Sequence, residues 1–437
     1  MFQSLIMTRY FIFLFIALGF LNCSAQQKTN PATPATNATK IVPAAERTEV
    51  YLPLLKGKKV AVFANQTSTV GNEHLVDVLK KNGVTIKVIF GPEHGFRGTA
   101  DAGEKVESTI DKATGVPVVS LYGKKRKPSK EDLADVDVML FDIQDVGVRF
   151  YTYISSLQEY METAIEYNLP LVVLDRPNPN GHYVDGPVLE PKFKSFVGMQ
   201  PVSVVYGMTM GEYAKMILEE GWLSKEAMEA YTQNVLAATY PPGAKYFGLE
   251  VVPCANYTHK SLYELPVKPS PNLPDMSSIY WYPSTCLFEG TVLSEGRGTN
   301  KPFQIFGHPS LPKNLFSFTP TSREGAKEPK LKNQKCYGWD VSGTTEEVLK
   351  KVDNKLQLQY LLQAYQLFPE KNKFFLISKK ENIQDTDYFF NKLAGNATLM
   401  QQIKAGKTEA EIRKSWEPGL KAFKAIRKKY LLYPDFE

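Results

Sequence analysis

The chain has 437 residues, of which 43% are hydrophobic, and it carries a net charge of +6 and four cysteines. This hydrophobic content supports a packed globular core and excludes a largely disordered chain. The modest, dispersed positive charge does not indicate nucleic acid as a partner. The four widely spaced cysteines argue against a disulfide framework and against a cysteine-rich metal site.

The first 25 residues have the pattern of a secretory signal. Arg9 is their only charged side chain, Tyr10–Leu21 is almost continuously apolar, and small residues follow up to Ala25. An apolar run of about a dozen residues is shorter than the roughly 20 needed to span a bilayer. We therefore predict an exported protein, periplasmic or extracellular, that is cleaved after Ala25. As an alternative, Leu21-Asn22-Cys23 resembles a lipobox, and a lipid on Cys23 would then be the protein's link to a membrane.

Residues 26–46 are rich in Gln, Thr, Asn, Pro and Ala, which predicts a flexible linker. Beyond the linker, short apolar strands alternate with helices, a pattern typical of right-handed βαβ units. We therefore expect an α/β fold with a Rossmann-like, doubly wound, mostly parallel sheet. The strands are predicted at 59–64, 84–90, 117–121, 136–141 and 171–174, with helices around 75–79 and over 153–168.

The pattern loosens beyond about residue 185, and residues 264–312 are rich in Pro, Gly and Ser. We place a catalytic domain at 47–299 and a smaller α/β ancillary domain at 300–437. Later elements are predicted as a helix over 209–220, a strand over 249–253, a helix over 344–368 and a helix over 408–430 that breaks near Pro418.

No cofactor or metal is predicted. The first strand is followed by Asn65-Gln66-Thr67-Ser68 instead of the G-x-G-x-x-G fingerprint, which argues against a nicotinamide or flavin cofactor. The histidines at 94, 182, 259 and 308 are far apart in the sequence and lack the spacing of zinc ligands.

Four of the predicted strands end in polar residues: Asn65-Gln66, Glu93-His94, Asp142–Asp145 and Asp175-Arg176. The carboxyl ends of parallel strands meet at one edge of a sheet, where ligands bind in doubly wound folds. These side chains are therefore expected to converge on one cleft, which is the main argument from the residues for an enzyme. Asn65 is a candidate for substrate binding on this basis.

Glu93 is the candidate general acid. An apolar pocket formed by Phe90 and Phe96 would raise its pKa and keep it protonated near neutral pH. The alternative is a structural carboxylate that caps the following turn or pairs with Arg97, itself a candidate for substrate binding. His94 is a candidate to orient Glu93 or to bind substrate, and equally a candidate for a structural histidine.

Asp142 and Asp145 are candidates for a second catalytic carboxylate or for binding a sugar hydroxyl. The alternatives are that Asp142 caps a turn and that Asp145 pairs with Arg149. Tyr151 and Tyr153 begin a predicted helix and offer aromatic faces to a sugar ring, with core packing as the alternative.

Three turn-rich segments, at 175–181, 270–274 and 289–299, are candidates for presenting binding groups rigidly. Segment 289–299 places two carboxylates beside a glycine-flanked arginine, which suits contact with an anion or a sugar. A purely structural turn is the alternative for each segment. The candidate binding residues that they carry are Arg176, Asn178, Asn272, Glu295 and Arg297.

Five motifs occur together and in this order in one family. They are Phe-Gly-Pro-Glu-His-Gly-Phe-Arg-Gly at 90–98, Asp-Ile-Gln-Asp-Val-Gly-Val-Arg-Phe-Tyr-Thr-Tyr at 142–153, Leu-Asp-Arg-Pro-Asn-Pro at 174–179, Ser-Pro-Asn-Leu-Pro at 270–274, and Leu-Phe-Glu-Gly-Thr with Ser-Glu-Gly-Arg-Gly-Thr at 287–299. With them, essentially all of residues 50–435 resembles the NamZ-type exo-β-N-acetylmuramidases. Two residues depart from the family pattern: His182 stands where a second glycine is common, and Tyr206 where a histidine often stands.

The resemblance implies a glycoside hydrolase that releases terminal N-acetylmuramic acid from the non-reducing end of peptidoglycan fragments. It also implies a Rossmann-like catalytic domain with a C-terminal ancillary domain, and it makes Glu93 the catalytic glutamate with His94 beside it. The lactyl carboxylate of such a substrate needs a cation, for which Arg149, Arg176 and Arg297 are candidates.

The second catalytic group stays open between Asp142, Asp145, Glu295 and the acetamido group of the substrate itself. Two rival functions also stay open. One is an envelope glycan esterase or deacetylase, which the absence of a G-x-S-x-G elbow disfavours. The other is a glycan-binding protein without catalysis, which a fold alone does not exclude.

Overall fold

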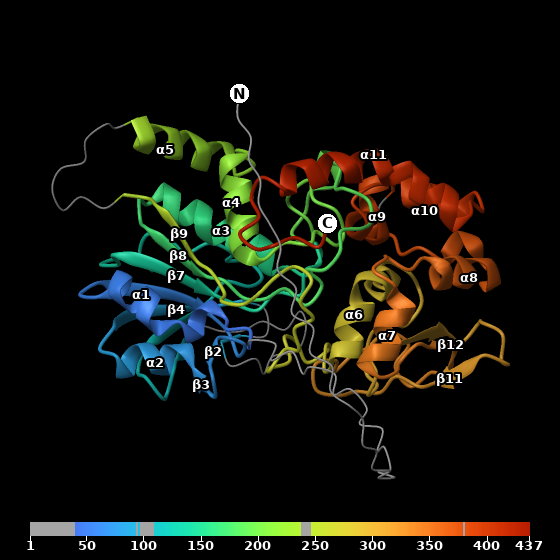
Figure 1. Cartoon of the computed structure of the whole chain (residues 1–437). Coiled ribbons are helices and arrows are strands. Elements are labelled where there is room, and N and C mark those ends of the chain that lie inside the picture. Colours follow the sequence, from blue (N-terminus) through green and yellow to red (C-terminus); the bar gives the residue numbers. More distant parts are fainter. Residues whose placement is uncertain (1–39, 93–94, 97–108, 237–245, 379–380) are drawn as a thin grey trace, which may run out of the picture. The chain divides into compact units, whose positions relative to one another are not determined.

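The computed structural model describes residues 40–92, 95–96, 109–236, 246–378 and 381–437 (Figure 1). The predicted signal peptide, most of the predicted linker, and the candidates Glu93, His94 and Arg97 lie outside the described residues.

A seven-stranded sheet occupies the first part of the described chain, in the order β5-β6-β4-β1-β7-β8-β9. Neighbouring strands are parallel except for β5 and β6. Without β5 this is the 3-2-1-4-5-6 order of the Rossmann fold, so the predicted mostly parallel sheet is confirmed. The strands are β1 (Lys59–Ala64), β4 (Thr85–Gly91), β5 (Thr109–Ile110), β6 (Pro117–Ser120), β7 (Val138–Asp142), β8 (Leu171–Leu174) and β9 (Leu249–Val252).

Helices cover both faces of this sheet, as expected for a doubly wound fold (Figure 1). Alternate side chains of a strand point to opposite faces. In β1, Val60 and Val62 pack with α1 and α2, whereas Ala61 and Phe63 pack with α3 and α4. Burial on both faces explains why the central strands β1, β7 and β8 are almost continuously apolar. The helices are α1 (Thr48–Leu55), α2 (Leu75–Lys81), α3 (Tyr153–Glu166), α4 (Met210–Glu219) and α5 (Lys225–Leu236).

The rest of the chain contains a three-stranded antiparallel sheet, in the order β10-β12-β11, and six further helices among the described residues. The strands are β10 (Ile305–His308), β11 (Phe316–Phe318) and β12 (Cys336–Asp340). The helices are α6 (Met276–Thr285), α7 (Thr345–Val352), α8 (Gln359–Leu367), α9 (Phe389–Ala394), α10 (Thr398–Lys404) and α11 (Glu409–Arg427). A two-stranded ribbon, β2 (Thr69–Val70) with β3 (Glu73–His74), precedes α2.

Three predicted helix starts coincide with capping boxes. Thr209, Thr344 and Thr408 each accept a hydrogen bond from the backbone of a glutamate three residues later, and that glutamate's side chain accepts one in return. This exchange satisfies two backbone donors that a helix start otherwise leaves unpaired. Local sequence chemistry therefore determines where α4, α7 and α11 begin.

Two predictions about the later helices are wrong. The helix predicted over 344–368 is two helices, because Asp353 and Asn354 adopt positive φ angles of 49° and 51° between α7 and α8. The helix predicted to break near Pro418 continues through it as α11. Pro418 and Lys414, whose carbonyl loses its helical partner, are both exposed residues, and the buried Trp416 and Phe423 hold the helix against the core.

The last residues assigned to the linker are folded. Val42 and Ala255 exchange two backbone hydrogen bonds of 2.9 and 2.8 Å. Ala44 and Ala45, in the 3₁₀ helix Ala44–Glu46, are fully buried. The folded part therefore begins before residue 46, where the sequence analysis ended the linker.

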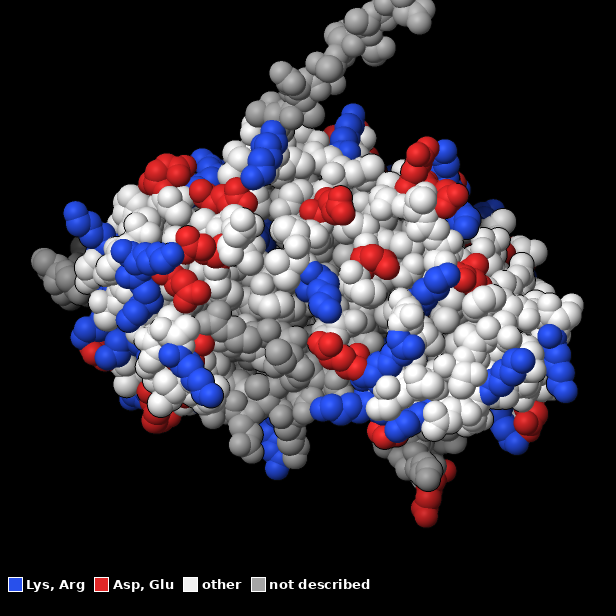
Figure 2. Space-filling view, turned by 90° about the horizontal axis from the view of Figure 1, so that it is seen from below, with Lys and Arg blue, Asp and Glu red and all other residues white. Residues whose placement is uncertain are grey.

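Within the described ranges, no helix is long and apolar enough to cross a bilayer. Cys254, Cys286 and Cys336 are buried and unpaired. On the face that Figure 2 presents, Lys and Arg side chains are interspersed with Asp and Glu.

Candidate active site

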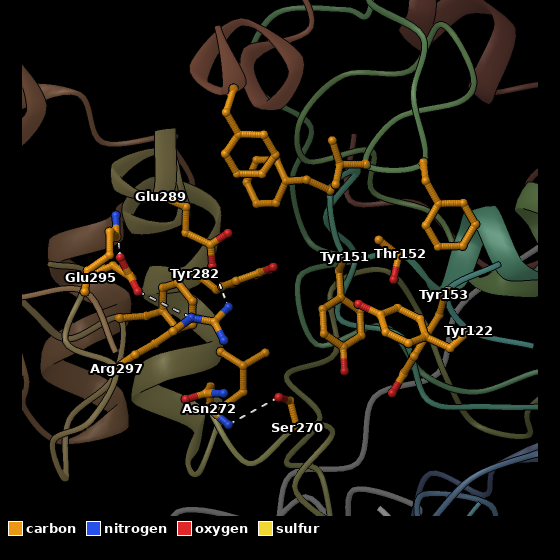
Figure 3. A pocket seen from close by; sticks show the side chains of 18 of the residues that line it. Tyr122, Tyr151, Thr152, Tyr153, Ser270, Asn272, Tyr282, Glu289, Glu295 and Arg297 are labelled. Carbon is orange, nitrogen blue, oxygen red and sulfur yellow. Dashed lines mark hydrogen bonds and ion pairs between the residues drawn. The ribbon is translucent and has the colours of Figure 1, made fainter. Parts of the chain in front are cut away.

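A pocket of about 700 Å³ lies at the carboxyl edge of the seven-stranded sheet (Figure 3). Tyr122 and Gly123 follow β6, and residues 150–153 follow β7. In the sheet, β6 and β7 lie on opposite sides of the central pair β4 and β1. The strand order reverses at this point, where doubly wound folds bind ligands. The lining residues are Tyr122, Gly123, Arg126, Phe150, Tyr151, Thr152, Tyr153, Phe196, Val197, Ser270, Asn272, Leu273, Tyr282, Glu289, Glu295, Arg297, Phe303, Lys330 and Phe389.

A row of aromatic rings crosses the pocket. The ring centroids of Tyr151 and Tyr153 are 4.7 Å apart, those of Tyr151 and Tyr282 5.9 Å, and those of Tyr282 and Phe303 4.8 Å. The Tyr151 hydroxyl donates a 2.9 Å hydrogen bond to the carbonyl of Pro269, which fixes the ring. Aromatic rings held in this way offer apolar faces with polar edges, which suits the binding of a sugar ring.

A network of ion pairs occupies one wall of the pocket (Figure 3). Arg297 lies 2.5 Å from Glu289 and 3.4 Å from Glu295, and Lys330 lies 2.8 Å from Glu295. The predicted grouping of two carboxylates around Arg297 is therefore present. Burial alone would raise the pKa of Glu295, but Lys330 and Arg297 outweigh it and hold that pKa below its ordinary value. Glu295 is thus ionised at neutral pH and is unsuited to donate a proton.

Asp142 and Arg176 form a buried pair outside the pocket lining. The guanidinium approaches the carboxylate with two contacts of 2.5 and 2.8 Å and donates a third hydrogen bond to the Thr69 carbonyl at 3.0 Å. Their side chains are 0% and 2% exposed. The pair ties together the ends of β7 and β8, so each group has its partner in the other and neither is presented to a substrate.

Asp145 is buried beneath the pocket region and does not line it. One carboxylate oxygen accepts hydrogen bonds from the Tyr206 hydroxyl and the Gly147 amide, while the other has no hydrogen-bond partner among the described residues. Burial raises the pKa of Asp145 to about 6, although both hydrogen bonds oppose the rise. The pairing of Asp145 with Arg149 that was the alternative is not formed. Tyr206 therefore contacts Asp145 and not the pocket.

We predict that replacing Asp145 with asparagine changes how stability depends on pH. The folded-state pKa of about 6 lies above the ordinary 3.8, so the folded protein binds this proton more tightly than the unfolded chain does. Wild-type stability consequently falls as pH rises through this window, by about 1–3 kcal/mol. The free energy of unfolding of the Asp145→Asn variant, taken relative to that of wild type, should therefore be about 1–3 kcal/mol higher at pH 7 than at pH 4. Urea denaturation at the two pH values measures this difference. An offset that is the same at both pH values would contradict the prediction.

Arg149 is fully buried and lies outside the pocket lining. It donates hydrogen bonds to the carbonyls of Pro187 (2.8 Å), Val202 (2.7 Å) and Leu393 (2.9 Å). Burial lowers the pKa of Arg149 to about 9. Its guanidinium joins α9 to the loops beside the seven-stranded sheet, and a substrate carboxylate does not reach it in this structure.

Comparison with known proteins agrees with this geometry. The model of the N-terminal domain of the exo-beta-N-acetylmuramidase NamZ matches residues 60–277, and the model of its C-terminal domain matches residues 280–433. The chain belongs to the NamZ family. It is 38% identical to the peptidoglycan beta-N-acetylmuramidase NamZ of Bacillus subtilis (strain 168) over 407 residues, which are 88% of this chain and 89% of that protein.

Two solved structures from Bacteroides fragilis NCTC 9343, both of DUF1343 family proteins, share the fold of this NamZ-family chain. BF0379 is 43% identical with a TM-score of 0.78, and the match covers 91% of this chain and 100% of that one. BF0371 is 26% identical with a TM-score of 0.69, and the match covers 90% of this chain and 99% of that one.

The two NamZ models meet between residues 277 and 280. The domain boundary predicted from the sequence, 299/300, lies between the last strand of the seven-stranded sheet and the first strand of the three-stranded sheet. That boundary stays a prediction.

The three candidate asparagines are all hydrogen-bonded to protein groups. The Asn65 side-chain amide donates to the hydroxyl of Tyr153 at 3.0 Å, directly behind the pocket wall. The side-chain amide of Asn178 donates to the Met208 carbonyl at 2.8 Å. The side-chain amide of Asn272 donates to the Gly325 carbonyl at 2.7 Å. Asn272 alone of the three lines the pocket.

The strand that precedes Glu93 and His94 in the chain ends close to the pocket lining, and those two residues lie outside the described ranges. β4 ends at Gly91, whose carbonyl accepts a 2.9 Å hydrogen bond from Leu121, the neighbour of the pocket residue Tyr122. The prediction that Phe90 and Phe96 enclose one apolar pocket is wrong. Phe90 packs in the core under α3, whereas Phe96 packs in the core under α2, on the other face of the sheet.

Sequence reasoning did not single out Arg126, Tyr282, Phe303 or Lys330 as pocket residues. Arg126 lies in a run of basic residues, which is typical of a solvent-exposed surface. The other three residues belong to no recognisable local motif. Among the residues that the structure describes, no group of three or more His, Cys, Asp and Glu side chains is arranged to hold a metal ion.

Proposed function

We propose that this NamZ-family chain is an exo-acting β-N-acetylmuramidase. It hydrolyses the β-glycosidic bond that links a terminal, non-reducing N-acetylmuramic acid to the rest of a peptidoglycan fragment. The observation that carries the proposal is the pocket at the sheet's switch point, with its aromatic row and ion-paired carboxylates, in a chain 38% identical to a peptidoglycan beta-N-acetylmuramidase.

In the proposed reaction, Glu93 donates a proton to the glycosidic oxygen as the bond to the anomeric carbon breaks, and water supplies the new hydroxyl group. The end of β4 supports this role, since Gly91 is hydrogen-bonded to Leu121, the sequence neighbour of the pocket residue Tyr122. The anomeric centre gains positive charge in the transition state. Glu289 and Glu295 line the pocket and are held in ion pairs with Arg297. Both are placed to stabilise that charge, and Glu295, whose pKa is held below its ordinary value, is unsuited to donate the proton.

We further propose that the protein works outside the cytoplasm. The apolar N-terminal segment with the pattern of a secretory signal supports export, and so does a substrate that belongs to the cell envelope. Attachment to a membrane would depend on a lipid on Cys23.

A pair of isomeric disaccharides tests the proposed activity. The mature protein is incubated with N-acetylmuramyl-β-1,4-N-acetylglucosamine and, separately, with N-acetylglucosaminyl-β-1,4-N-acetylmuramic acid, and products are separated by mass spectrometry. We expect monosaccharides from the first isomer only, since only that isomer has muramic acid at its non-reducing end. Binding of the first isomer without release would favour the glycan-binding rival, and loss of an acetyl group would favour the esterase or deacetylase.

A further inference from the structure

Three cationic side chains line the pocket in the described part of the chain, and two of them are committed to protein partners. Arg297 contacts both Glu289 and Glu295. Lys330 pairs with Glu295 and donates to two backbone carbonyls at 3.0 and 3.1 Å. Neither cation has its charge available for an incoming anion without breaking one of these contacts.

Arg126 is the third cation, and its surroundings differ. Its guanidinium carbon lies 4.0 Å from the ring centroid of Phe196, which also lines the pocket. No carboxylate oxygen of a described residue lies within 4.0 Å of it. In contrast, its neighbours in the sequence are paired: Lys125 lies 2.5 Å from Asp132, and Lys127 lies 2.7 Å from Glu162.

The N–H donors of a guanidinium lie in its own plane, so contact of its face with an aromatic ring leaves these donors free at its edge. This arrangement leaves the edge able to bind a carboxylate through two parallel hydrogen bonds. Arg126 is also exposed at the pocket, so a ligand reaches it without displacing core side chains. Its position therefore fits an anionic substituent on a sugar that occupies the pocket.

We propose that Arg126 binds the lactyl carboxylate of N-acetylmuramic acid and so selects this sugar over N-acetylglucosamine. The proposal rests on the proposed function. The two sugars differ by the lactyl ether, and its carboxylate is the only charge that distinguishes them. Arg126 thereby takes the role for which the sequence suggested Arg149, Arg176 and Arg297.

Steady-state kinetics with two chromogenic substrates test the proposal: 4-nitrophenyl β-N-acetylmuraminide and its lactyl methyl ester, which lacks the negative charge. For the acid, we expect Arg126→Gln to raise KM by about 10- to 100-fold, as for the loss of a charge-assisted hydrogen bond. We expect kcat to stay within about threefold, and Arg126→Lys to recover part of the loss. For the methyl ester, wild type and Arg126→Gln should have the same KM, because the partner charge is gone.

Lys124→Gln is the matched control, because it removes a charge from the same exposed run and does not line the pocket. An unchanged KM for the acid in Arg126→Gln, or an equal rise for the acid and the ester, would overturn the proposal. Failure of wild type to hydrolyse either substrate would instead overturn the proposed function. In that case, calorimetric binding of free N-acetylmuramic acid to wild type and Arg126→Gln decides the role of Arg126, since equal affinities would overturn it.

Discussion

Replacing Glu93 with glutamine is expected to lower kcat for release of N-acetylmuramic acid by about 10²- to 10⁴-fold, the range found when a general acid is removed. Glutamine has nearly the shape of glutamate and keeps its hydrogen-bonding capacity, but it has no acidic proton for the leaving oxygen. KM should change little, because the aromatic row and the ion-paired wall of the pocket remain. The measurement is turnover of the muramic-acid-capped disaccharide, together with calorimetric binding of the same sugar.

Glu226→Gln is a matched control for this variant. It makes the same chemical change on the exposed surface of α5, outside the pocket lining, and turnover should stay at the wild-type level. A Glu93→Gln variant that turns over at more than about a tenth of the wild-type rate would remove Glu93 from the role of general acid. Glu289, a carboxylate that lines the pocket, would then be the next candidate for the general acid.

The largest loss of stability is expected from replacing Arg176 with methionine. This change removes the partner of Asp142 and leaves a fully buried carboxylate with no countercharge. Breaking a buried ion pair on one side costs about 3–5 kcal/mol in the free energy of unfolding. We expect urea denaturation to show a loss of this size. Because Arg176 does not line the pocket, KM of the folded variant should be close to that of wild type.

Two further variants test whether the loss of stability comes from the buried ion pair and not from removing a positive charge as such. Lys350→Met breaks an exposed 2.8 Å pair with Glu346 on α7 and should cost only about 0.3–0.5 kcal/mol. The double variant Asp142→Leu with Arg176→Met removes both buried charges and should be more stable than Arg176→Met alone. If the two single losses simply added in the double variant, the two groups would not be coupled.

The alternation of apolar strands and helices along the chain was enough to predict a mostly parallel sheet, although not its antiparallel edge strand β5. The central strands β1, β7 and β8 are apolar because both of their faces are buried, and this pattern is visible locally, without knowledge of the fold. The helix starts at Thr209, Thr344 and Thr408 can also be recognised locally, because each threonine exchanges hydrogen bonds with a glutamate only three residues later. The contact of Arg297 with Glu289 was also predictable, because the two residues are eight positions apart.

Which charged groups remain available to a ligand depends on contacts that form only in the folded protein. Asp142 and Arg176, 34 positions apart, satisfy each other, and Arg149 donates to a carbonyl 244 positions away. In the sequence these three residues were site candidates because they lie near the ends of predicted strands, whereas Arg126 lies in a run of basic residues. An ionised group that is buried must find partners, and those partners come from whatever the fold places beside it. The role of a charged residue is therefore set by contacts between distant segments, which no local pattern records.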